Sequence, residues 1–204
     1  PADAGNYTVK VQYETDTEIH TGTANFTIAP KTLTKDDLTY SGPISKVYDG
    51  NTNAPSGLTV SVKPGSLVGS DTLAVSGTLK YNSANVNEAK QIIFTPTAIT
   101  TGNYALAATE MLTITGATIT QADQAPLTAT YGEDLTLTVS GGDGDGAVSY
   151  TVTNGTGAAT IVDGSKLHPT KAGTVSVTAT KAGGDNYEDV TSAVAAITIG
   201  QAVY

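Results

Sequence analysis

The chain has 204 residues, no Cys, no Trp and two His, and 19 acidic against 10 basic residues give it a formal net charge of -9. The lack of Cys excludes disulfide scaffolds, Cys-based zinc sites, iron–sulfur clusters and thiol nucleophiles, and two His cannot form a three-His metal site. The acidic balance argues against nucleic-acid binding, and no apolar run is long enough to span a bilayer.

Charged residues make up 14% of the chain and hydrophobic residues 39%. Disordered chains usually combine low hydrophobicity with a high net charge per residue. Here the polar residues are mostly Thr, Ser and Asn, and Thr suits a half-buried strand surface. We therefore expect a folded, β-rich chain.

Residues 1–30 contain two predicted strands, NYTVKVQY (6–13) and TANFTIAP (23–30), in which apolar and polar residues alternate. We interpret this segment as the closing hairpin of a preceding module. A lone two-stranded hairpin is marginal in water, so it either packs on the next domain, pairs with another chain, or is the remnant of a longer domain. A start at Pro1, without Met or signal peptide, suggests an excised fragment.

Residues 31–121 form the predicted middle domain. Its strands are expected near 32–40, 44–48, 58–63, 71–81, 91–99, 104–108 and 110–119. Residues 122–204 form the predicted third domain. Its strands are expected at 126–130, 134–140, 148–154, 159–162, 166–169, 174–181 and 193–199.

A weak internal repeat supports these boundaries. Gly5, Gly102 and Gly173 each precede an alternating strand, and each is followed by a turn region and a second strand. Strands of this length with turns every 8–12 residues indicate sandwiches, and short Pro-containing linkers favour a semi-rigid array. The predicted fold class is all-β, with tandem Ig-like β-sandwich domains in an elongated array.

The segment KVYDGNT (46–52) resembles the signature of the YDG domain, a repeat of large bacterial surface and secreted proteins. The resemblance continues through VGSDTLAVSGTLKYNSANVNEAKQIIF (68–94) and TGNYAL (101–106). PADAGNYTVKV and TANFTIAPKTLT resemble the end of a neighbouring MBG-type or Ig-like repeat, and residues 122–200 resemble bacterial Ig-like domains. The resemblance implies an extracellular sandwich array in adhesin-like proteins, without an established catalytic residue.

Tyr48, Asp49 and Gly50 suggest either a recognition surface or a structural turn. The turn is the better interpretation, because Asp and Gly supply turn chemistry. Tyr7 and Tyr104 follow Gly-Asn at the start of predicted strands, which is typical of a structural tyrosine corner. Tyr187 is expected to pack in a loop.

Asp143 and Asp145 alternate in GGDGDG as at the start of a calcium loop. The EF-hand pattern then fails, because Ala147 and Asn154 occupy ligand positions. A looser calcium site remains a weak alternative to a flexible Gly-rich connection, and no cofactor is expected.

Catalytic arrangements are lacking in the sequence. His20 and His168 are isolated, and the pairs Glu133–Asp134 and Asp36–Asp37 are adjacent, so in strands their side chains point to opposite faces. We expect no enzymatic activity.

One covalent possibility is a Lys–Asn isopeptide bond, as in some Gram-positive surface domains. It needs an inward-facing Lys, for which Lys46, Lys80 and Lys90 are candidates. The sequence singles out no Asn or acid partner.

The predicted function is a non-catalytic structural or spacer segment of a bacterial surface or secreted adhesin-like protein. The alternative is a carbohydrate- or host-protein-binding module that uses surface Tyr residues or a joint between domains. The expected partners are other modules of the same parent chain and a host glycan or protein, with no nucleic acid and no membrane insertion. Self-association through residues 1–30 is a further hypothesis, because unpaired strand edges can pair with another chain.

Overall fold

The computed structural model describes residues 2–126, 128–131 and 135–201. Within these residues the regular elements are β-strands and one short 3-10 helix, so the prediction of an all-β chain is confirmed. No helix in this part of the chain is long and apolar enough for a membrane crossing.

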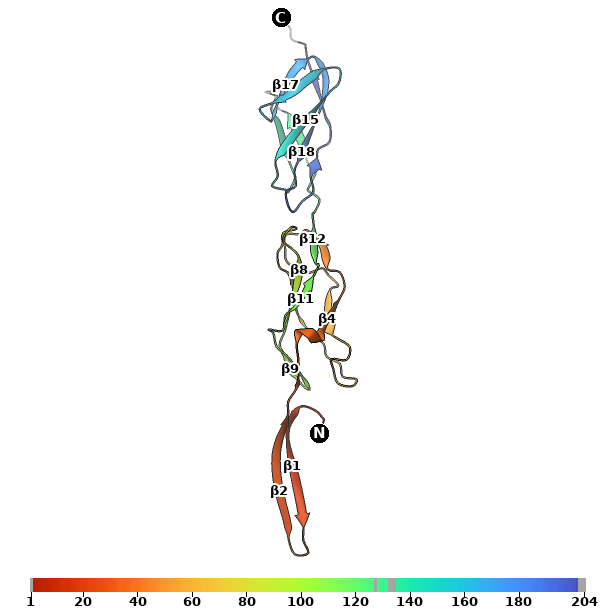
Figure 1. The fold of residues 1–204 in the computed structure, drawn as a ribbon. Helices are drawn as coiled ribbons and strands as arrows, with labels where there is room; N and C mark the ends of the chain where they lie inside the picture. The colour runs from red at the N-terminus through yellow and green to blue at the C-terminus, as the bar shows by residue number, and fades with distance from the viewer. Residues whose placement is uncertain (1, 127, 132–134, 202–204) are drawn as a thin grey trace. The chain divides into compact units, whose positions relative to one another are not determined.

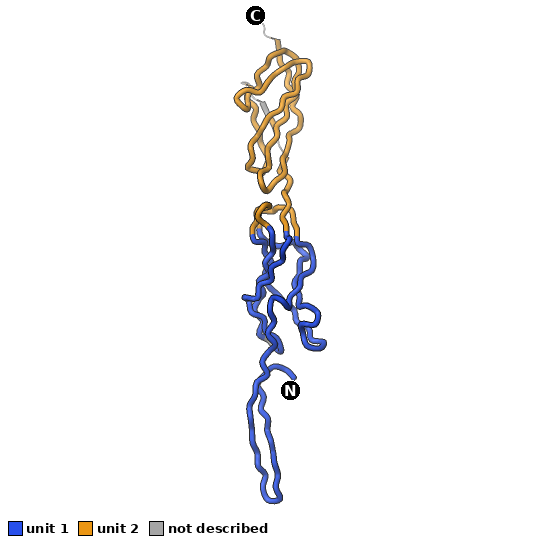
Figure 2. The backbone as a smooth tube through the Cα atoms, in the orientation of Figure 1, with its two compact units in different colours: residues 1–44, 52–82, 90–117 blue, residues 45–51, 83–89, 118–204 orange. Residues whose placement is uncertain are grey.

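Contacts within the chain divide it into two compact units (Figure 2). Unit 1 comprises residues 1–44, 52–82 and 90–117, and unit 2 comprises residues 45–51, 83–89 and 118–204. Three short segments of the predicted middle domain, residues 45–51, 83–89 and 118–121, thus belong to unit 2. Compact units are not the same as independently folding domains, so the domains 1–30, 31–121 and 122–204 stay a prediction.

Unit 1 begins with a long hairpin of β1 (Gly5–Glu14) and β2 (Ile19–Ile28) (Figure 1). The strands are antiparallel, from the pair Gly5–Ile28 to the pair Glu14–Ile19. Each strand has ten residues. β1 and β2 both extend further toward the turn than the predicted strands 6–13 and 23–30, and β2 ends at Ile28. In the described chain this sheet has two strands only.

The remainder of unit 1 consists of short strands in three small sheets. In chain order its elements are β3 (Lys31–Leu33), the 3-10 helix η1 (Lys35–Asp37), β4 (Leu38–Ser41), β6 (Thr59–Val62), β7 (Gly77–Tyr81), β8 (Gln91–Pro96), β9 (Ile99–Thr101), β10 (Tyr104–Leu106) and β11 (Leu112–Thr115). The sheet orders are β3-β10-β9, β11-β8-β7 and β4-β6, and only β3 and β10 are parallel.

The core of unit 1 gathers side chains from several of these sheets. Its buried members are Leu33, Leu38, Phe94, Tyr104 and Leu106. β8 shows how the pattern works, because alternate residues of QIIFTP are buried. Period-two alternation therefore directs one face of each strand to this core.

Four of the predicted strands of the middle domain are wrong in part, and one of them is the range 91–99, which is divided between β8 and β9. The range 32–40 is interrupted by η1, because the Asp37 carboxylate accepts hydrogen bonds from the Thr34 amide and hydroxyl and closes a turn. The range 71–81 is a strand only from Gly77, and the range 110–119 is divided at Gly116.

Unit 2 contains the other strands. They are β5 (Ser45–Val47), β12 (Thr118–Thr120), β13 (Thr128–Tyr131), β14 (Leu137–Ser140), β15 (Val148–Asn154), β16 (Ala158–Val162), β17 (Lys166–Lys171), β18 (Gly173–Lys181), β19 (Val190–Thr191) and β20 (Ala195–Ile199). β5 and β12 pair in parallel, whereas β13-β14 and β16-β17 are antiparallel pairs.

β18 is the centre of unit 2. It pairs antiparallel with β15, and also with β20 and β19. Val175 and Val177 point into the core with 1% of each residue exposed, next to Leu137, Leu167 and Ile197. The predicted alternation in TVSVTAT is confirmed here as a strand with one buried face.

Candidate functional site

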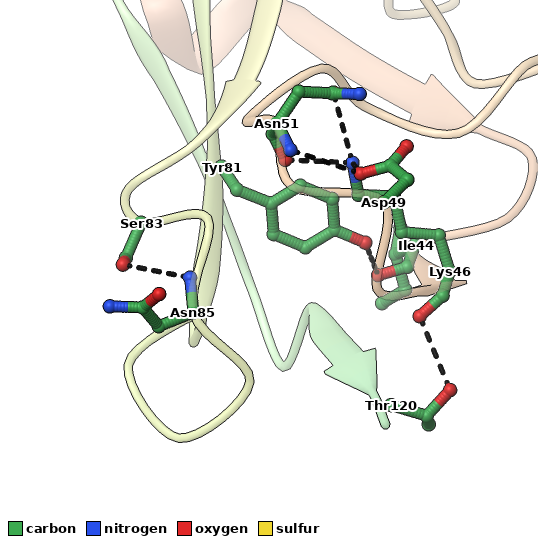
Figure 3. A network of polar contacts seen from close by, with 8 residues as sticks. All are labelled: Ile44, Lys46, Asp49, Asn51, Tyr81, Ser83, Asn85 and Thr120. Atoms are coloured by element: carbon green, nitrogen blue, oxygen red, sulfur yellow. Dashed lines mark hydrogen bonds and ion pairs between the residues drawn. The ribbon is translucent and has the colours of Figure 1, made fainter. Parts of the chain in front are cut away.

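The signature segment 46–52 begins within β5, which pairs with β12. The Tyr48 amide donates a hydrogen bond to the Thr120 carbonyl (2.8 Å) and so continues the strand pairing by one residue. The Thr120 hydroxyl donates to the Lys46 carbonyl (3.4 Å; Figure 3). These bonds anchor the start of the signature loop.

The Lys46 side chain joins the two ends of the signature loop by hydrogen bonds to Asp49 and Asn51. The side chain is 10% exposed, and Nζ donates to Asp49 Oδ1 (2.6 Å), the Asn51 carbonyl (2.9 Å) and Asn51 Oδ1 (3.1 Å). The Asn51 amide also donates to Asp49 Oδ1 (3.2 Å; Figure 3). Gly50 has a φ of 74°, a left-handed conformation that favours glycine. Asp49 and Gly50 thus form a turn around one ammonium group.

The charge on Asp49 is stabilised by these contacts. The Lys46 hydrogen bond, followed by the Asn51 amide bond, lowers the pKa of Asp49 and outweighs the opposing effect of partial burial. Asp49 itself stays 47% exposed at its side chain, so solvent screens the ion pair. The arrangement therefore holds an ionised carboxylate in a structural role.

A buried tyrosine in unit 1 supports the chain just before this segment. Tyr81 is 3% exposed, and its hydroxyl donates to the Ile44 carbonyl (2.9 Å; Figure 3). The Tyr81 amide donates to the Thr52 carbonyl (2.7 Å). Tyr81 therefore binds Ile44 and Thr52, the two residues of unit 1 that flank segment 45–51.

A second loop of unit 2, residues 83–89, is held by its own polar side chains. Ser83 Oγ donates to Glu88 Oε2 (2.7 Å) and accepts from the Asn85 amide (3.1 Å). The Val86 amide donates to Asn186 Oδ1 (2.9 Å). The last bond ties this loop to the segment before β19.

In the Gly-rich segment 141–146, Gly144 and Gly146 pack closely against residues 182–183, and the interpretation of the segment as a flexible connection stays a prediction. A Cβ on Gly144 would lie 2.7 Å from the Gly183 carbonyl oxygen, closer than side-chain carbons approach. Gln124 is buried between the same segments. Its Oε1 accepts from the Gly144 amide (2.9 Å) and its Nε2 donates to the Glu188 carbonyl (2.7 Å).

These loops surround a polar cavity of about 500 Å³ within unit 2. The rings of Tyr48 and Tyr187 lie edge to face at its wall, with centroids 5.2 Å apart. The remaining lining residues are Asn85, Asp143, Asp145, Gly183, Asp185 and Asn186. Aromatic rings beside amides and carboxylates make this cavity the candidate binding site of the described chain.

The calcium hypothesis for Asp143 and Asp145 gains no further support. Both residues line the cavity, but no group of three His, Cys, Asp or Glu residues within the described ranges could hold a metal ion. Asp143 Oδ2 accepts a hydrogen bond from the Ala125 amide (2.7 Å), which gives this carboxylate a local structural partner.

The two predicted corner tyrosines, Tyr7 and Tyr104, differ in how far their side chains are buried. Tyr104 is 5% exposed; its hydroxyl accepts from the Val68 amide (2.7 Å) and donates to Asp71 Oδ2 (2.8 Å). The Val68 hydrogen bond lowers the pKa of Tyr104, but burial and the Asp71 carboxylate raise it. The pKa of Tyr104 is therefore above its ordinary value. Tyr7 is half-buried in the hairpin, and its hydroxyl donates to the Asp3 carbonyl (2.7 Å).

The isolated titratable residues are scattered. His20 and His168 are exposed on β2 and β17. Asp36 and Asp37 lie in η1 and not in a strand, so the expected opposite-face geometry does not apply. Glu133 and Asp134 lie outside the described residues.

The candidates for an isopeptide bond are sharply reduced. Lys80 and Lys90 are exposed and do not point inward. Lys46 does contact an Asn and an acid. However, amide formation requires a neutral amine and an acid that can donate a proton to the carboxamide, whereas the lowered pKa of Asp49 favours the carboxylate. Lys46 and Asp49 form an ion pair, and Asn51 accepts hydrogen bonds from the same ammonium group.

Comparison with known families gives one match. Residues 29–112 match the YDG domain model, which confirms that part of the resemblance seen at the signature segment. Neither the comparison with curated proteins nor that with solved structures found a match.

Sequence reasoning overlooked three features of this site. Lys46 stands three and five residues before Asp49 and Asn51, which is a local signal for a closed loop. Gln124 and the contact between Gly144 and Gly183 depend on residues about 40 to 60 positions apart. No local pattern announces such contacts.

Proposed function

We propose that this chain is a non-catalytic structural segment of a bacterial surface or secreted adhesin-like protein. It is built of tandem Ig-like sandwiches, lies outside the cell, and links or presents binding modules of the parent chain. The three predicted domain ranges belong to this proposal.

One observation carries it: the best-organised polar side chains serve the chain's own backbone and loops. Lys46 Nζ donates hydrogen bonds to Asp49 and Asn51, and Gln124 joins three backbone segments. The Tyr104 hydroxyl binds Val68 and Asp71. Polar side chains that are hydrogen-bonded within the chain stabilise its loops. Such side chains are poorly placed to act on a substrate.

The family match adds a second line of support. Residues 29–112 match the YDG domain model, and the YDG domain is a repeat of large bacterial surface and secreted proteins. Extracellular location and the adhesin-like context rest on this resemblance.

Small-angle X-ray scattering of the 204-residue chain tests the array. A single compact globule of this length has a radius of gyration of about 17 Å. We expect a clearly larger radius and an asymmetric distance distribution for a semi-rigid array. A monomer with a radius near 17 Å contradicts the proposal.

A second candidate function is favoured by the cavity at Tyr48 and Tyr187. Tyrosine rings stack on sugar faces, and the neighbouring Asn and Asp side chains can bind hydroxyl groups. In this alternative, unit 2 binds a carbohydrate or a host protein.

A glycan array followed by titration of any hit tests this alternative. Tyr187→Ala should weaken binding at least about tenfold if the ring contacts the ligand. Tyr40→Ala is the matched control, because Tyr40 is an exposed tyrosine of unit 1. No hit, or equal loss in both variants, rejects the cavity as the binding site.

A further inference from the structure

The cavity of unit 2 beside Tyr48 and Tyr187 is lined by acidic side chains and by no basic one. Three of its described lining residues are Asp143, Asp145 and Asp185, and none of them is Lys or His. A cleft whose charges have one sign concentrates the electrostatic field and attracts ligands of the opposite charge. The lining therefore favours a ligand that carries a positive charge.

The fold leaves most of these carboxylate oxygens without a partner. The side chains of Asp145 and Asp185 make no hydrogen bond or ion pair with a described residue. Asp143 accepts the Ala125 amide at Oδ2 (2.7 Å), and its Oδ1 is left for another donor. Asp145 Oδ1 packs directly against Gly184, where a Cβ would overlap it. The cavity thus presents acceptors that no loop of the described chain uses.

Two asparagine amides in the lining are held in place by the loops that carry them. Asn186 Oδ1 accepts from the Val86 amide (2.9 Å), and Asn186 Nδ2 donates to Asn85 Oδ1 (3.4 Å). Asn85 Nδ2 donates to Glu88 Oε2 (3.3 Å). A carboxamide nitrogen has two N–H groups, so each amide keeps one donor for a ligand.

The spacing of the acids excludes a bare metal ion and favours an organic cation. No group of three His, Cys, Asp or Glu residues in the described ranges could hold a metal ion. The rings of Tyr48 and Tyr187 lie 5.2 Å apart at an interplanar angle of 75°. The face of an aromatic ring attracts an ammonium group electrostatically. A cavity of about 500 Å³ is also within the size range of small-molecule sites.

A sugar that carries an ammonium group pairs with more of this lining than a lysine side chain does. A lysine side chain is apolar up to its Nζ, so it would cover the Asn85 and Asn186 amides without binding them. Unpaired polar groups that lose water are costly. An amino sugar has hydroxyl groups for the amides, a C–H face for the tyrosine rings and an ammonium group for the carboxylates.

We propose that the cavity of unit 2 binds an amino sugar with a free ammonium group and discriminates against its neutral, N-acetylated form. The assignment rests on the carbohydrate-binding alternative given above, because it names the ligand class of that same cavity. Asp143, Asp145 and Asp185 are exposed, so water and salt screen their charge. We therefore expect a weak site, with a preference for the free amine of about tenfold.

Titration of the whole chain with the disaccharide of glucosamine, followed by two-dimensional amide NMR, tests the proposal. The N,N′-diacetylated disaccharide is the neutral control. At about pH 6 and low salt, the amide signals of Gly183 and Asn186 should shift, with a dissociation constant at least about tenfold lower for the free amine. Salt at about 0.5 M should reduce this preference.

The outcomes of this titration separate the two levels of the proposal. If the acetylated disaccharide binds as tightly as the free amine, the ammonium site is wrong and the carbohydrate-binding alternative stands. If neither disaccharide binds at about 10 mM, both are wrong and the spacer function stands alone.

Charge-removing variants then test the carboxylates. The double change Asp145→Asn with Asp185→Asn should raise the dissociation constant for the free amine at least about fivefold. It should change that for the acetylated form less than about twofold. Asp163→Asn is the matched control, because Asp163 is an exposed acid of unit 2 outside the cavity lining. Equal loss for both sugars in the double variant overturns the ammonium site, and so does equal loss in the control.

A lysine peptide distinguishes recognition of the sugar from recognition of any ammonium group. The peptide Gly-Lys-Gly, acetylated and amidated at its ends, carries the same charge without the ring hydroxyl groups. It should bind at least about tenfold more weakly than the glucosamine disaccharide. Equal or tighter binding of the peptide overturns the amino-sugar assignment.

Discussion

β18 and β1 carry the same alternation, with valines at every second position in TVSVTAT (174–180) and in NYTVKVQY (6–13). In β18 the valines Val175 and Val177 are 1% exposed, whereas in β1 Val9 is 44% and Val11 is 60% exposed. β18 pairs with β15, β19 and β20 and packs against residues of other sheets, while β1 pairs with no strand except β2 among the described residues. The alternation therefore determines which residues share a face, and the neighbouring layers determine whether that face is buried.

The largest expected effect comes from placing the same substitution in both strands. Val177→Thr puts a hydroxyl among the hydrophobic side chains of the unit 2 core, where they offer it no hydrogen-bond partner. This should lower the free energy of unfolding by about 1–3 kcal/mol. Val11→Thr at an exposed position should change it by less than about 0.5 kcal/mol. Urea denaturation followed by circular dichroism, at dilute protein concentration, measures both. Equal effects contradict the contrast between covered and open faces.

Glycine substitutions test the contrast through close backbone approach. Gly144→Ala places a methyl group 2.7 Å from the Gly183 carbonyl oxygen, so the loops must separate, and we expect a loss of about 1–2 kcal/mol. Gly22→Ala in the hairpin meets no atom within 4 Å and should leave stability unchanged or raise it slightly. Amide hydrogen exchange near Gly144 and Gly22 reports each region separately. A neutral Gly144→Ala shows that segment 141–146 is loosely packed.

Individual strands of this fold can be predicted well from local alternation. The range 148–154 is a strand from Val148 to Asn154, as predicted. The prediction 32–40 is wrong in its middle, because Asp37 binds back to Thr34, and side-chain competition of this kind overrides a short alternating pattern. The cavity was not predictable, because the two tyrosines that line it come from loops 139 positions apart and glycine-mediated contacts leave no periodic signal.

Removal of a tyrosine hydroxyl gives a smaller effect and again separates a covered region from the hairpin. Tyr104→Phe leaves the Val68 amide and Asp71 without their shared partner, so we expect the melting temperature to fall by about 4 °C or more. Tyr7→Phe removes one exposed hydrogen bond to Asp3 and should shift it by less than about 2 °C. Differential scanning calorimetry compares the two variants. A larger shift for Tyr7→Phe reverses the assignment of Tyr104 as the structural tyrosine.

The smallest expected effect concerns acid stability at the signature loop. The pKa of Asp49 is lowered below its ordinary value of 3.8, chiefly by the Lys46 hydrogen bond. A carboxyl group with a lowered pKa in the folded state stabilises the fold above its unfolded pKa, and this contribution is lost as the pH falls through the folded pKa. The side chain is 47% exposed, so screening limits the contribution to less than about 1 kcal/mol at neutral pH.

Asp49→Asn should therefore lower stability at pH 7 by a few tenths of a kcal/mol and flatten the decline of stability below about pH 4. Glu14→Gln removes the same charge from the hairpin, where Glu14 accepts a hydrogen bond from Gln12 and makes no ion pair with a described residue. Urea denaturation from pH 2 to pH 7 compares the two variants. Asp37 continues to contribute in the same pH window, because its backbone hydrogen bond with Thr34 also lowers its pKa. If both variants follow the wild-type pH profile, the Lys46–Asp49 pair shapes the loop without stabilising it, and the contrast between loop and hairpin then lies in packing alone.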